Sequence, residues 1–222
     1  MRGTLLGWEG WEGWEGNSEV ATVSAGRNGP MVVYIHGFKS SPASIKAGLV
    51  RQWLKSRGKE SRFRCPALPY GPAAAAKLLE AEIRRLLQQR EQLFLIGSSL
   101  GGYYATWLAE RHGLKAAVVN PAIRPYEFSA EIVGPQQNLY TAEEFVFTEA
   151  HLEELRCLEV ESITPSRYLL MVTTGDEVID YRRAVARYSG SKIRIVEGSD
   201  HGFTDFGAYL PEAMEFCGFG KT

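Results

Sequence analysis

Residues 93–104 read Leu-Phe-Leu-Ile-Gly-Ser-Ser-Leu-Gly-Gly-Tyr-Tyr. The first four are apolar and predict a short strand buried in a sheet. Tyr103, Trp107 and Leu108 recur at helical spacing after the glycines and predict a helix there. Residues 97–101 fit the pattern G-x-S-x-G. The bare pattern is a weak signal, but its position between a strand and a helix is the setting in which a serine is presented on a sharp turn.

The residue types around Ser99 suit such a turn. A nucleophilic serine needs a tight, strained turn that lifts its hydroxyl above the sheet, where side chains at positions 97 and 101 would collide with the neighbouring backbone. Glycine at both positions removes this obstacle, and Gly102 adds further room. The alternative is an ordinary turn in which Ser99 caps the following helix. The nucleophile interpretation therefore depends on finding a base and an orienting acid nearby.

Strand-like and helix-like segments alternate on both sides of this turn. The alternation predicts an α/β fold, with a mostly parallel sheet of about six strands and helices on both faces. Strands are expected at residues 31–35, 63–68, 92–96, 115–120, 167–173 and 192–196. Helices are expected at residues 42–57, from 72 onward, and at 100–112, 181–188 and 207–216. Residues 121–164 interrupt the pattern, and we expect a cap or lid there with a short helix around residues 142–158.

An acid and a histidine follow two of the later strands. Asp176 comes just after the strand expected at residues 167–173, and His201 comes just after the strand expected at residues 192–196. The carboxyl ends of parallel strands meet at one edge of a sheet, so both side chains should lie near Ser99. The chain order serine, acid, histidine is that of the catalytic triad in α/β-hydrolases. We therefore predict that Ser99, Asp176 and His201 form a triad.

Two other acids and three other histidines compete for these roles. Asp180 precedes a helix and is expected to cap it, whereas Glu177 is expected to face solvent. His112 ends a helix, where its charge would suit the helix dipole. His151 is expected at the surface, and His36 is expected in the loop after the first strand.

The loop after the first strand, His36-Gly37-Phe38, has a second expected use. In α/β-hydrolases a backbone N–H of this loop forms half of the oxyanion hole, and the residue after the nucleophile, here Leu100, supplies the other. Two amides aimed at the developing oxyanion stabilise the transition state by several kcal/mol. The alternative is a plain turn that ends the strand.

Composition excludes several classes of function. The 222 residues include 25 Lys+Arg and 26 Asp+Glu, giving a formal net charge of −1. This balance argues against a protein that binds nucleic acid or an anionic membrane, and no apolar run is long enough to span a bilayer. Three widely spaced cysteines, Cys65, Cys157 and Cys217, fit reduced thiols in the cytoplasm and not disulfides or a zinc site. No metal or organic cofactor is expected.

Residues 8–16 repeat Trp-Glu-Gly three times. Glycine at every third position resists both helix and strand, so residues 1–30 are expected to form a disordered extension and residues 31–222 the folded domain. Two alternatives are an aromatic arm that binds a sugar or a protein, and a translation start at Met31.

Five sequence blocks together resemble the YqiA-type bacterial esterases, a family of small α/β-hydrolases. They are His-Gly-Phe-Lys-Ser-Ser-Pro at 36–42, Gly-Ser-Ser-Leu-Gly-Gly-Tyr-Tyr-Ala at 97–105, Asn-Pro-Ala-Ile-Arg-Pro-Tyr-Glu at 120–127, Thr-Gly-Asp-Glu-Val-Ile-Asp-Tyr-Arg at 174–182 and Asp-His-Gly-Phe at 200–203. The resemblance runs from about Met31 to the C-terminus and leaves out the Trp-Glu-Gly segment. It implies the triad named above and an oxyanion hole at Phe38 and Leu100.

The residues and the resemblance lead to the same expected function. We predict a serine esterase that hydrolyses small carboxylic esters or thioesters, including acyl-CoA, through an acyl-enzyme. Arg124 could attract a carboxylate or phosphate of the substrate, and Tyr126 could line an acyl pocket. Two alternatives stay open. One is a binding protein without turnover, and the other is a hydrolase of amides or C–C bonds with the same triad.

Overall fold

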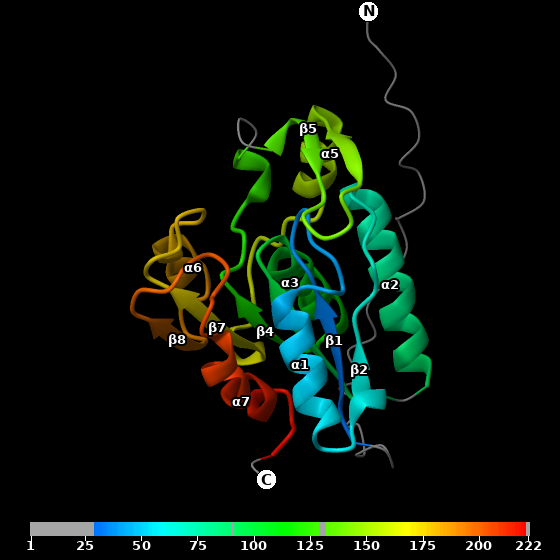
Figure 1. Cartoon of the computed structure of the whole chain (residues 1–222), viewed down its shortest axis with the longest axis vertical. Coiled ribbons are helices and arrows are strands. Elements are labelled where there is room, and N and C mark those ends of the chain that lie inside the picture. The colour runs from blue at the N-terminus through cyan, green and yellow to red at the C-terminus, as the bar shows by residue number, and fades with distance from the viewer. Residues whose placement is uncertain (1–28, 90, 129–131, 221–222) are drawn as a thin grey trace, which may run out of the picture.

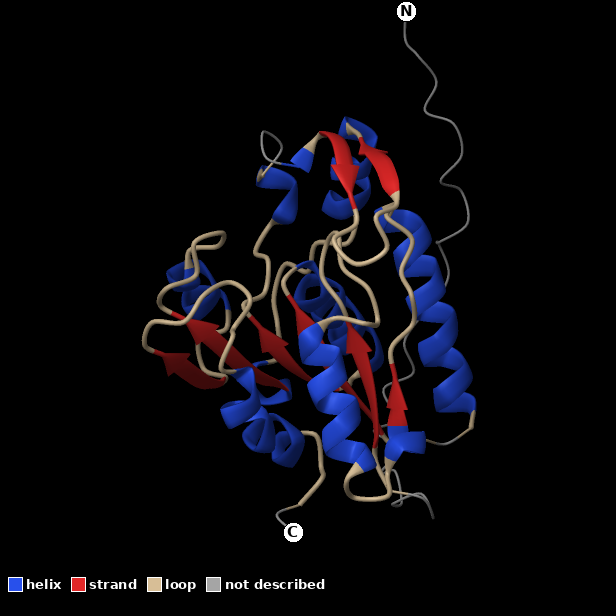
Figure 2. Ribbon diagram, viewed as in Figure 1, coloured by secondary structure: helices blue, strands red, loops and turns tan. Residues whose placement is uncertain are grey.

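The structure, a computed structural model, describes residues 29–89, 91–128 and 132–220. The Trp-Glu-Gly repeat lies outside these ranges. Within them the chain forms a six-stranded sheet with helices on both faces, which confirms the predicted α/β class (Figures 1 and 2). The strand order is β2-β1-β3-β4-β7-β8, and all five neighbouring pairs are parallel.

The elements have the following bounds. The strands of the large sheet are β1 (Met31–Ile35), β2 (Phe63–Arg64), β3 (Leu93–Ser98), β4 (Lys115–Val119), β7 (Tyr168–Thr173) and β8 (Lys192–Val196). The α-helices described are α1 (Ile45–Lys55), α2 (Pro72–Gln88), α3 (Leu100–His112), α5 (Glu149–Arg156), α6 (Tyr181–Arg187) and α7 (Phe206–Phe216). A separate antiparallel hairpin consists of β5 (Gly134–Gln137) and β6 (Glu144–Phe147). Short 3₁₀ turns lie at Glu60–Arg62, Pro125–Glu127 and Pro165–Arg167.

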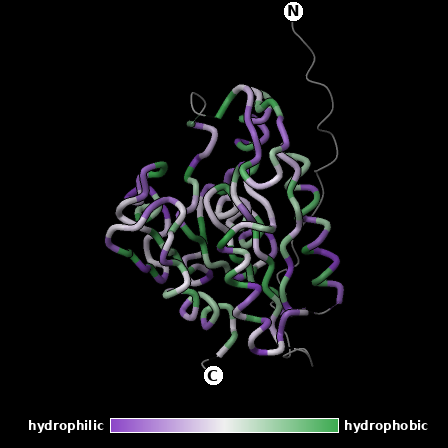
Figure 3. The backbone as a smooth tube through the Cα atoms, in the orientation of Figure 1, coloured by the Kyte–Doolittle hydropathy of each residue, from purple (hydrophilic) through white to green (hydrophobic). Residues whose placement is uncertain are grey.

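The central strands have no polar face because helices cover both sides of the sheet. Val33, Leu95 and other alternate strand residues pack against α2 and α3. Their neighbours in sequence, such as Val32 and Ile96, pack against α1 and α7. Every residue of β1 and β3 is buried, which explains why β1 and the first four residues of β3 are continuously apolar in sequence. Hydrophobic stretches accordingly run through the middle of the molecule (Figure 3).

The strand expected at residues 63–68 is shorter than predicted. Only Phe63 and Arg64 pair with β1. Pro66 follows, and proline has no N–H to donate to a neighbouring strand. The apolar residues after Arg64 therefore continue as a loop at the edge of the sheet.

The helix expected at residues 142–158 is also corrected. Its first part is β6, which pairs with β5, and only Glu149–Arg156 is helical. The run Glu-Phe-Val-Phe in β6 alternates in exposure at its end, with Val146 exposed and Phe147 buried. This alternation has the period of a half-buried strand, and the partner β5 supplies the backbone hydrogen bonds.

The segment between β4 and β7 lies over the carboxyl end of β1 (Figure 1). Hydrogen bonds fasten it to three elements. In the loop after β1, the Lys39 carbonyl oxygen accepts the Leu139 N–H at 2.8 Å. From α3, the Tyr103 hydroxyl donates to the Leu155 carbonyl oxygen at 2.8 Å. From α2, the Ala73 N–H donates to the Glu154 carboxylate at 2.9 Å. The hairpin and α5 are thus held above the edge of the sheet at which Ser99 lies.

Candidate active site

Ser99 lies between the last residue of β3 and the first residue of α3. Its backbone has φ 54° and ψ −124°, a conformation that costs a residue with a side chain about 1–3 kcal/mol. Its N–H donates to the Val119 carbonyl oxygen, and its own carbonyl oxygen accepts from the N–H groups of Gly102 and Ala122. The hydroxyl makes no helix-capping hydrogen bond, so the capping alternative for Ser99 is wrong.

Glycines allow the chain to pack closely around this turn. A Cβ atom on Gly101 would lie 2.0 Å from the Ile35 carbonyl oxygen, and one on Gly97 would lie 2.3 Å from the Gly101 carbonyl oxygen. Non-bonded heavy atoms cannot approach so closely, and both obstacles are backbone. The start of α3 therefore rests directly on the ends of β1 and β3, as the glycine pattern predicted.

The structure brings Ser99, His201 and Asp176 into one hydrogen-bonded chain. The His201 Nε2 lies 3.0 Å from the Ser99 Oγ, and the His201 Nδ1 lies 2.8 Å from the Asp176 Oδ2 and 3.0 Å from its Oδ1. The Asp176 side chain is only 2% exposed, whereas that of His201 is 21% exposed. The acid is thus enclosed, and the imidazole reaches the surface beside the serine.

The Asp176 carboxylate is also fixed by its own loop. Its Oδ1 accepts from the N–H groups of Val178 and Ile179, at 2.9 and 2.8 Å. A Cβ atom on Gly175 would lie 2.1 Å from the Ser199 carbonyl oxygen, so glycine lets this loop pack against the one that carries His201. These contacts orient the carboxylate toward the imidazole.

The two competing acids take other places. Asp180 caps α6 through the Arg182 N–H, which confirms the predicted role. Glu177 is exposed as expected, but its carboxylate also accepts the backbone N–H of His201 at 3.0 Å. Glu177 therefore contacts the histidine's backbone and not its ring.

The other histidines lie in separate contacts. His112 is the last residue of α3, as expected, and its Nε2 lies 2.8 Å from the carboxylate of the buried Glu80 on α2. His151 caps α5 together with Thr148. Neither histidine touches Ser99.

Asn120 is a residue of the site that we did not predict from the sequence. It is buried directly after β4, with φ 41°. Its Nδ2 donates toward the carbonyl oxygens of Asp200 and His201, at 3.3 and 3.2 Å, and toward the Thr173 hydroxyl at 3.0 Å, while its Oδ1 accepts the Thr173 N–H. One buried amide thus ties the ends of β4 and β7 to the His201 loop. In the sequence Asn120 is the last residue of the strand expected at residues 115–120 and the first of the block at residues 120–127.

The loop after β1 lies against Ser99. A Cβ atom on Gly37 would lie 3.1 Å from the Ser99 Cβ and 3.6 Å from its Oγ. Within the part of the chain that the structure describes, the backbone N–H groups of Phe38 and Leu100 have no hydrogen-bond acceptor. Leu100 begins α3, so its N–H is one of the donors that a helix leaves unpaired. Two unpaired donors therefore flank the serine.

His36 lies in this loop, as the sequence predicted, and its ring fixes the loop. Its Nδ1 lies 3.1 Å from the Gly37 carbonyl oxygen, and its Nε2 accepts the Leu68 N–H at 3.2 Å. These contacts require a neutral ring that carries its proton on Nδ1. Burial lowers the pKa of His36, which favours the same neutral form.

A small cavity of about 40 Å³ adjoins the two unpaired amides. Its apolar wall comes from four separate segments, with side chains that include Phe38, Leu68, Tyr104 and Phe145. The hairpin contributes Phe145, whose ring stacks on Tyr70 with the centroids 4.8 Å apart. The segment between β4 and β7 therefore lines the space beside the serine.

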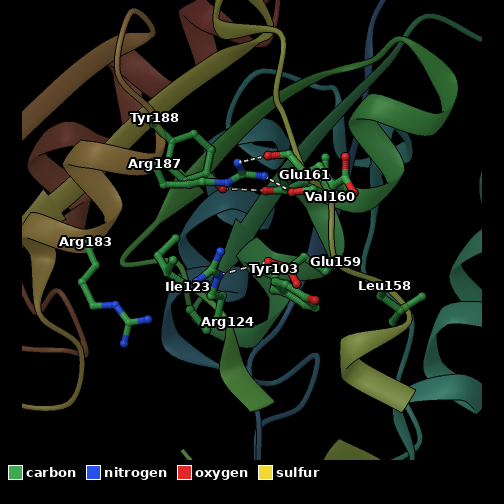
Figure 4. A pocket seen from close by; sticks show the side chains of 12 residues that line it. Tyr103, Ile123, Arg124, Leu158, Glu159, Val160, Glu161, Arg183, Arg187 and Tyr188 are labelled. Carbon is green, nitrogen blue, oxygen red and sulfur yellow. Dashed lines mark hydrogen bonds and ion pairs between the residues drawn. The ribbon is translucent and has the colours of Figure 1, made fainter. Parts of the chain in front are cut away.

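Arg124 and Tyr126 lie elsewhere. Both bind the Glu159 carboxylate, Arg124 at 3.1 Å. Burial, and after it the hydrogen bond from the Tyr126 hydroxyl to Glu159, raises the pKa of Tyr126 to about 12. Arg124 lines a cavity of about 580 Å³, where Arg187 donates to the carbonyl oxygens of residues 160 and 161 (Figure 4). No triad residue lines this cavity. A substrate-binding role for Arg124 and Tyr126 stays a prediction.

In residues 29–89, 91–128 and 132–220, no three His, Cys, Asp or Glu side chains are grouped to hold a metal ion. No helix in the same ranges has the length and apolar character needed to cross a membrane.

The chain is similar to a known protein family and to solved structures. A family model described as Uncharacterised protein family (UPF0227) matches residues 31–218. The UPF0227 protein YcfP of Salmonella paratyphi A is 25% identical over 195 residues, covering 86% of this chain and 100% of that protein. Two solved structures show the fold. They are Est1E from Butyrivibrio proteoclasticus with ferulic acid bound (TM-score 0.65, 15% identity, 86% of this chain and 87% of that one) and the mouse alpha/beta hydrolase domain-containing protein 10 (TM-score 0.62, 16% identity, 84% and 90%).

These similarities confirm the predicted α/β-hydrolase fold and the resemblance that was based on five sequence blocks. The family match begins at residue 31, the first residue of β1. The chain therefore belongs to the UPF0227 family.

Proposed function

We propose that the protein is a serine hydrolase that cleaves carboxylic esters or thioesters of small molecules. The observation that carries the proposal is the hydrogen-bonded chain from Ser99 through His201 to Asp176. A serine, a neutral imidazole and a buried carboxylate in this order form the arrangement that turns a hydroxyl into a nucleophile.

In the first step the Ser99 Oγ forms a bond to the substrate's carbonyl carbon, and its proton passes to the His201 Nε2. The Asp176 carboxylate holds the imidazole with its other proton on Nδ1 and stabilises the imidazolium. The bond from the carbonyl carbon to the leaving oxygen or sulfur then breaks, and the leaving group takes the proton from Nε2. An acyl-enzyme on Ser99 remains.

Water completes the cycle. The His201 Nε2 takes a proton from the water while the water oxygen forms a bond to the acyl carbon. The bond between the acyl carbon and the Ser99 Oγ then breaks, the Oγ takes the proton from Nε2, and the acid leaves. In both steps negative charge develops on the former carbonyl oxygen. The N–H groups of Phe38 and Leu100 are the donors that we assign to it, because they are unpaired and flank Ser99.

The fold supports the same reaction class. The chain has the fold of α/β-hydrolases, in which a serine on a strand-to-helix turn is the usual nucleophile. The strained backbone of Ser99 also fits a catalytic role, because strain of this kind persists where the surrounding structure imposes it.

Release of p-nitrophenol from short-chain p-nitrophenyl esters tests the proposal. Wild type should turn over, and Ser99→Ala should lose at least about 1,000-fold in kcat/KM. The matched control is Ser98→Ala, which removes the neighbouring serine hydroxyl from the end of β3. Equal background rates for wild type and Ser99→Ala would contradict the proposal.

Parallel assays on thioesters and amides separate the remaining candidates. Turnover of amides but not of esters or thioesters would agree with the triad and would assign amides as the substrate class. Binding of acyl compounds without turnover of any of the three would favour a binding protein that retains the fold.

A further inference from the structure

Lys46 connects α1 to the loop that carries His201. It is the second residue of α1, and its Nζ donates to the Gly202 carbonyl oxygen at 2.5 Å across 156 positions of sequence. The side chain is half-buried and forms no direct ion pair with the described residues. A lysine whose ammonium is partly desolvated and bonded to a carbonyl next to the histidine calls for an explanation.

The surroundings of His201 are strongly acidic. Asp176 contacts its ring, Glu177 accepts its backbone N–H, and Asp200 precedes it. Asp205, at the start of α7, accepts the Ser199 hydroxyl in the same loop. Of these four carboxylates, Asp176 is the one that contacts the imidazole. A carboxylate beside an imidazole favours the protonated, cationic form, which cannot act as a base.

Lys46 is the cation that the described structure bonds to this loop. Burial lowers the pKa of Lys46, while the charges of Asp200 and Asp176 oppose that change. The ordinary pKa of lysine, about 10.4, lies about four units above that of histidine, and the two carboxylates favour the ammonium form of Lys46. The positive charge of Lys46 therefore interacts with Asp176, the carboxylate that contacts the His201 ring, and with Asp200, the residue before His201.

Building on the triad proposed above, we propose that Lys46 is a positioning residue that holds the His201 loop through the Gly202 carbonyl and offsets the carboxylates around the imidazole. Coulomb's law gives the direction in which Lys46 changes the pKa of His201. An ammonium near an imidazolium disfavours it, so His201 loses its proton at a lower pH than it would without Lys46. The site then keeps a neutral base further into the acid range.

The direct test is the pKa of the His201 ring, measured by NMR titration of the full chain at constant low salt. The His201 signals are assigned by their loss in His201→Ala. Lys46→Met removes the charge and the hydrogen bond, Lys46→Gln removes the charge but keeps a donor, and Lys46→Arg keeps the charge. We expect the pKa of His201 to rise by about 0.5–1 unit in the Met and Gln variants and to change little in the Arg variant.

The matched control is Lys55→Met, the same substitution at the other end of α1, where the side chain is exposed. This variant should leave the pKa of His201 unchanged. An unchanged pKa in Lys46→Met or Lys46→Gln would overturn the proposal. If Lys46→Met does not fold, the pKa of His201 is compared between Lys46→Gln and Lys46→Arg. It should be higher in the Gln variant, because only that variant loses the positive charge.

Activity gives a second readout. In Lys46→Gln the acid limb of the kcat/KM profile should shift to higher pH, by the same amount as the pKa of His201 measured by NMR. The two proposals fail in different ways. Absence of turnover in wild type would contradict the esterase function and leave the NMR result valid. An active wild type, together with an unchanged pKa of His201 in Lys46→Gln, would contradict only the role of Lys46.

Discussion

The imidazole Nε2 of His201 lies 3.0 Å from the hydroxyl oxygen of Ser99, although 102 positions separate the two residues in the chain. Neither residue reaches this position by its own local structure. The Ser99 turn is set by glycines that let α3 rest on β1, and the His201 loop is tied down by Asn120. The geometry of the site therefore depends on buried backbone contacts as much as on the three side chains.

The strain at Ser99 should be measurable as stability. Ser99→Gly removes the side chain from a backbone with positive φ, whereas Ser99→Ala keeps the Cβ atom and the strain. Both variants lose the hydroxyl and its bond to His201, so the pair isolates the backbone effect. Urea unfolding should show Ser99→Gly more stable than Ser99→Ala by about 1 kcal/mol. Equal stability, or a more stable Ala variant, would show that the turn is not strained.

The close packing of α3 on β1 predicts a large loss at Gly101. In Gly101→Ala the new Cβ atom would lie 2.0 Å from the Ile35 carbonyl oxygen, and the turn must shift to avoid it. We expect a loss of at least about 3 kcal/mol in unfolding free energy, together with loss of the Ser99 geometry.

The matched control for Gly101→Ala is Gly48→Ala in α1, where a Cβ atom would meet nothing within 4 Å. Alanine has the higher helix propensity, so this change should stabilise the protein by about 0.5–1 kcal/mol. Chemical unfolding of both variants checks the contrast, and a similar effect of the two substitutions would refute the packing argument.

Asp176 should be indispensable for activity and nearly neutral for the fold. In Asp176→Asn the amide oxygen can still accept from the N–H groups of Val178 and Ile179, but an NH₂ group then faces the His201 Nδ1 and favours the wrong tautomer. We expect kcat/KM to fall by about 10³–10⁴-fold. Asp180→Asn should keep full activity, because asparagine caps a helix as well as aspartate does. A fully active Asp176→Asn would point to another orienting acid.

Because of the buried His36 ring, we expect the unfolding free energy to fall in acid. Burial lowers its pKa in the folded state below the ordinary value of about 6.5, so the unfolded chain binds the proton first as the pH falls. The stability that depends on the neutral ring is therefore complete above about pH 6.5 and is lost as the pH falls below it. Unfolding free energies at pH 7.5 and 5.5 should differ less in His36→Gln than in wild type. The same difference in both proteins would exclude His36 as the cause.

The sequence predicted the parts of this structure that local chemistry controls. The strand, turn and helix around Ser99 were predictable because glycine, serine and apolar residues each have a defined place in that turn. Pro72 at the first position of α2 and Asp180 at the cap of α6 were predictable for the same reason. Asp176 and His201 could be placed near Ser99 because both follow parallel strands, which end at one edge of the sheet.

Most other contacts between distant segments could not be predicted. The β5 strand, Gly-Pro-Gln-Gln, has no apolar alternation and contains a proline, so only its pairing with β6 makes it a strand. Asn120 and Lys46 look like ordinary polar residues in the sequence. Their roles arise because the fold brings the loop at residues 198–205 next to the end of β4 and to α1, and no motif in the sequence predicts these particular hydrogen bonds.

The most direct measurement of the central claim is covalent labelling by an organophosphonate, read by intact mass and by peptide mapping. Such reagents react with a serine that a neighbouring base has activated. Wild type should gain the mass of one phosphonyl group on the peptide that contains Ser99, while Ser99→Ala should gain none and His201→Ala should react far more slowly. An unlabelled wild type, or a label on a residue other than Ser99, would contradict the account.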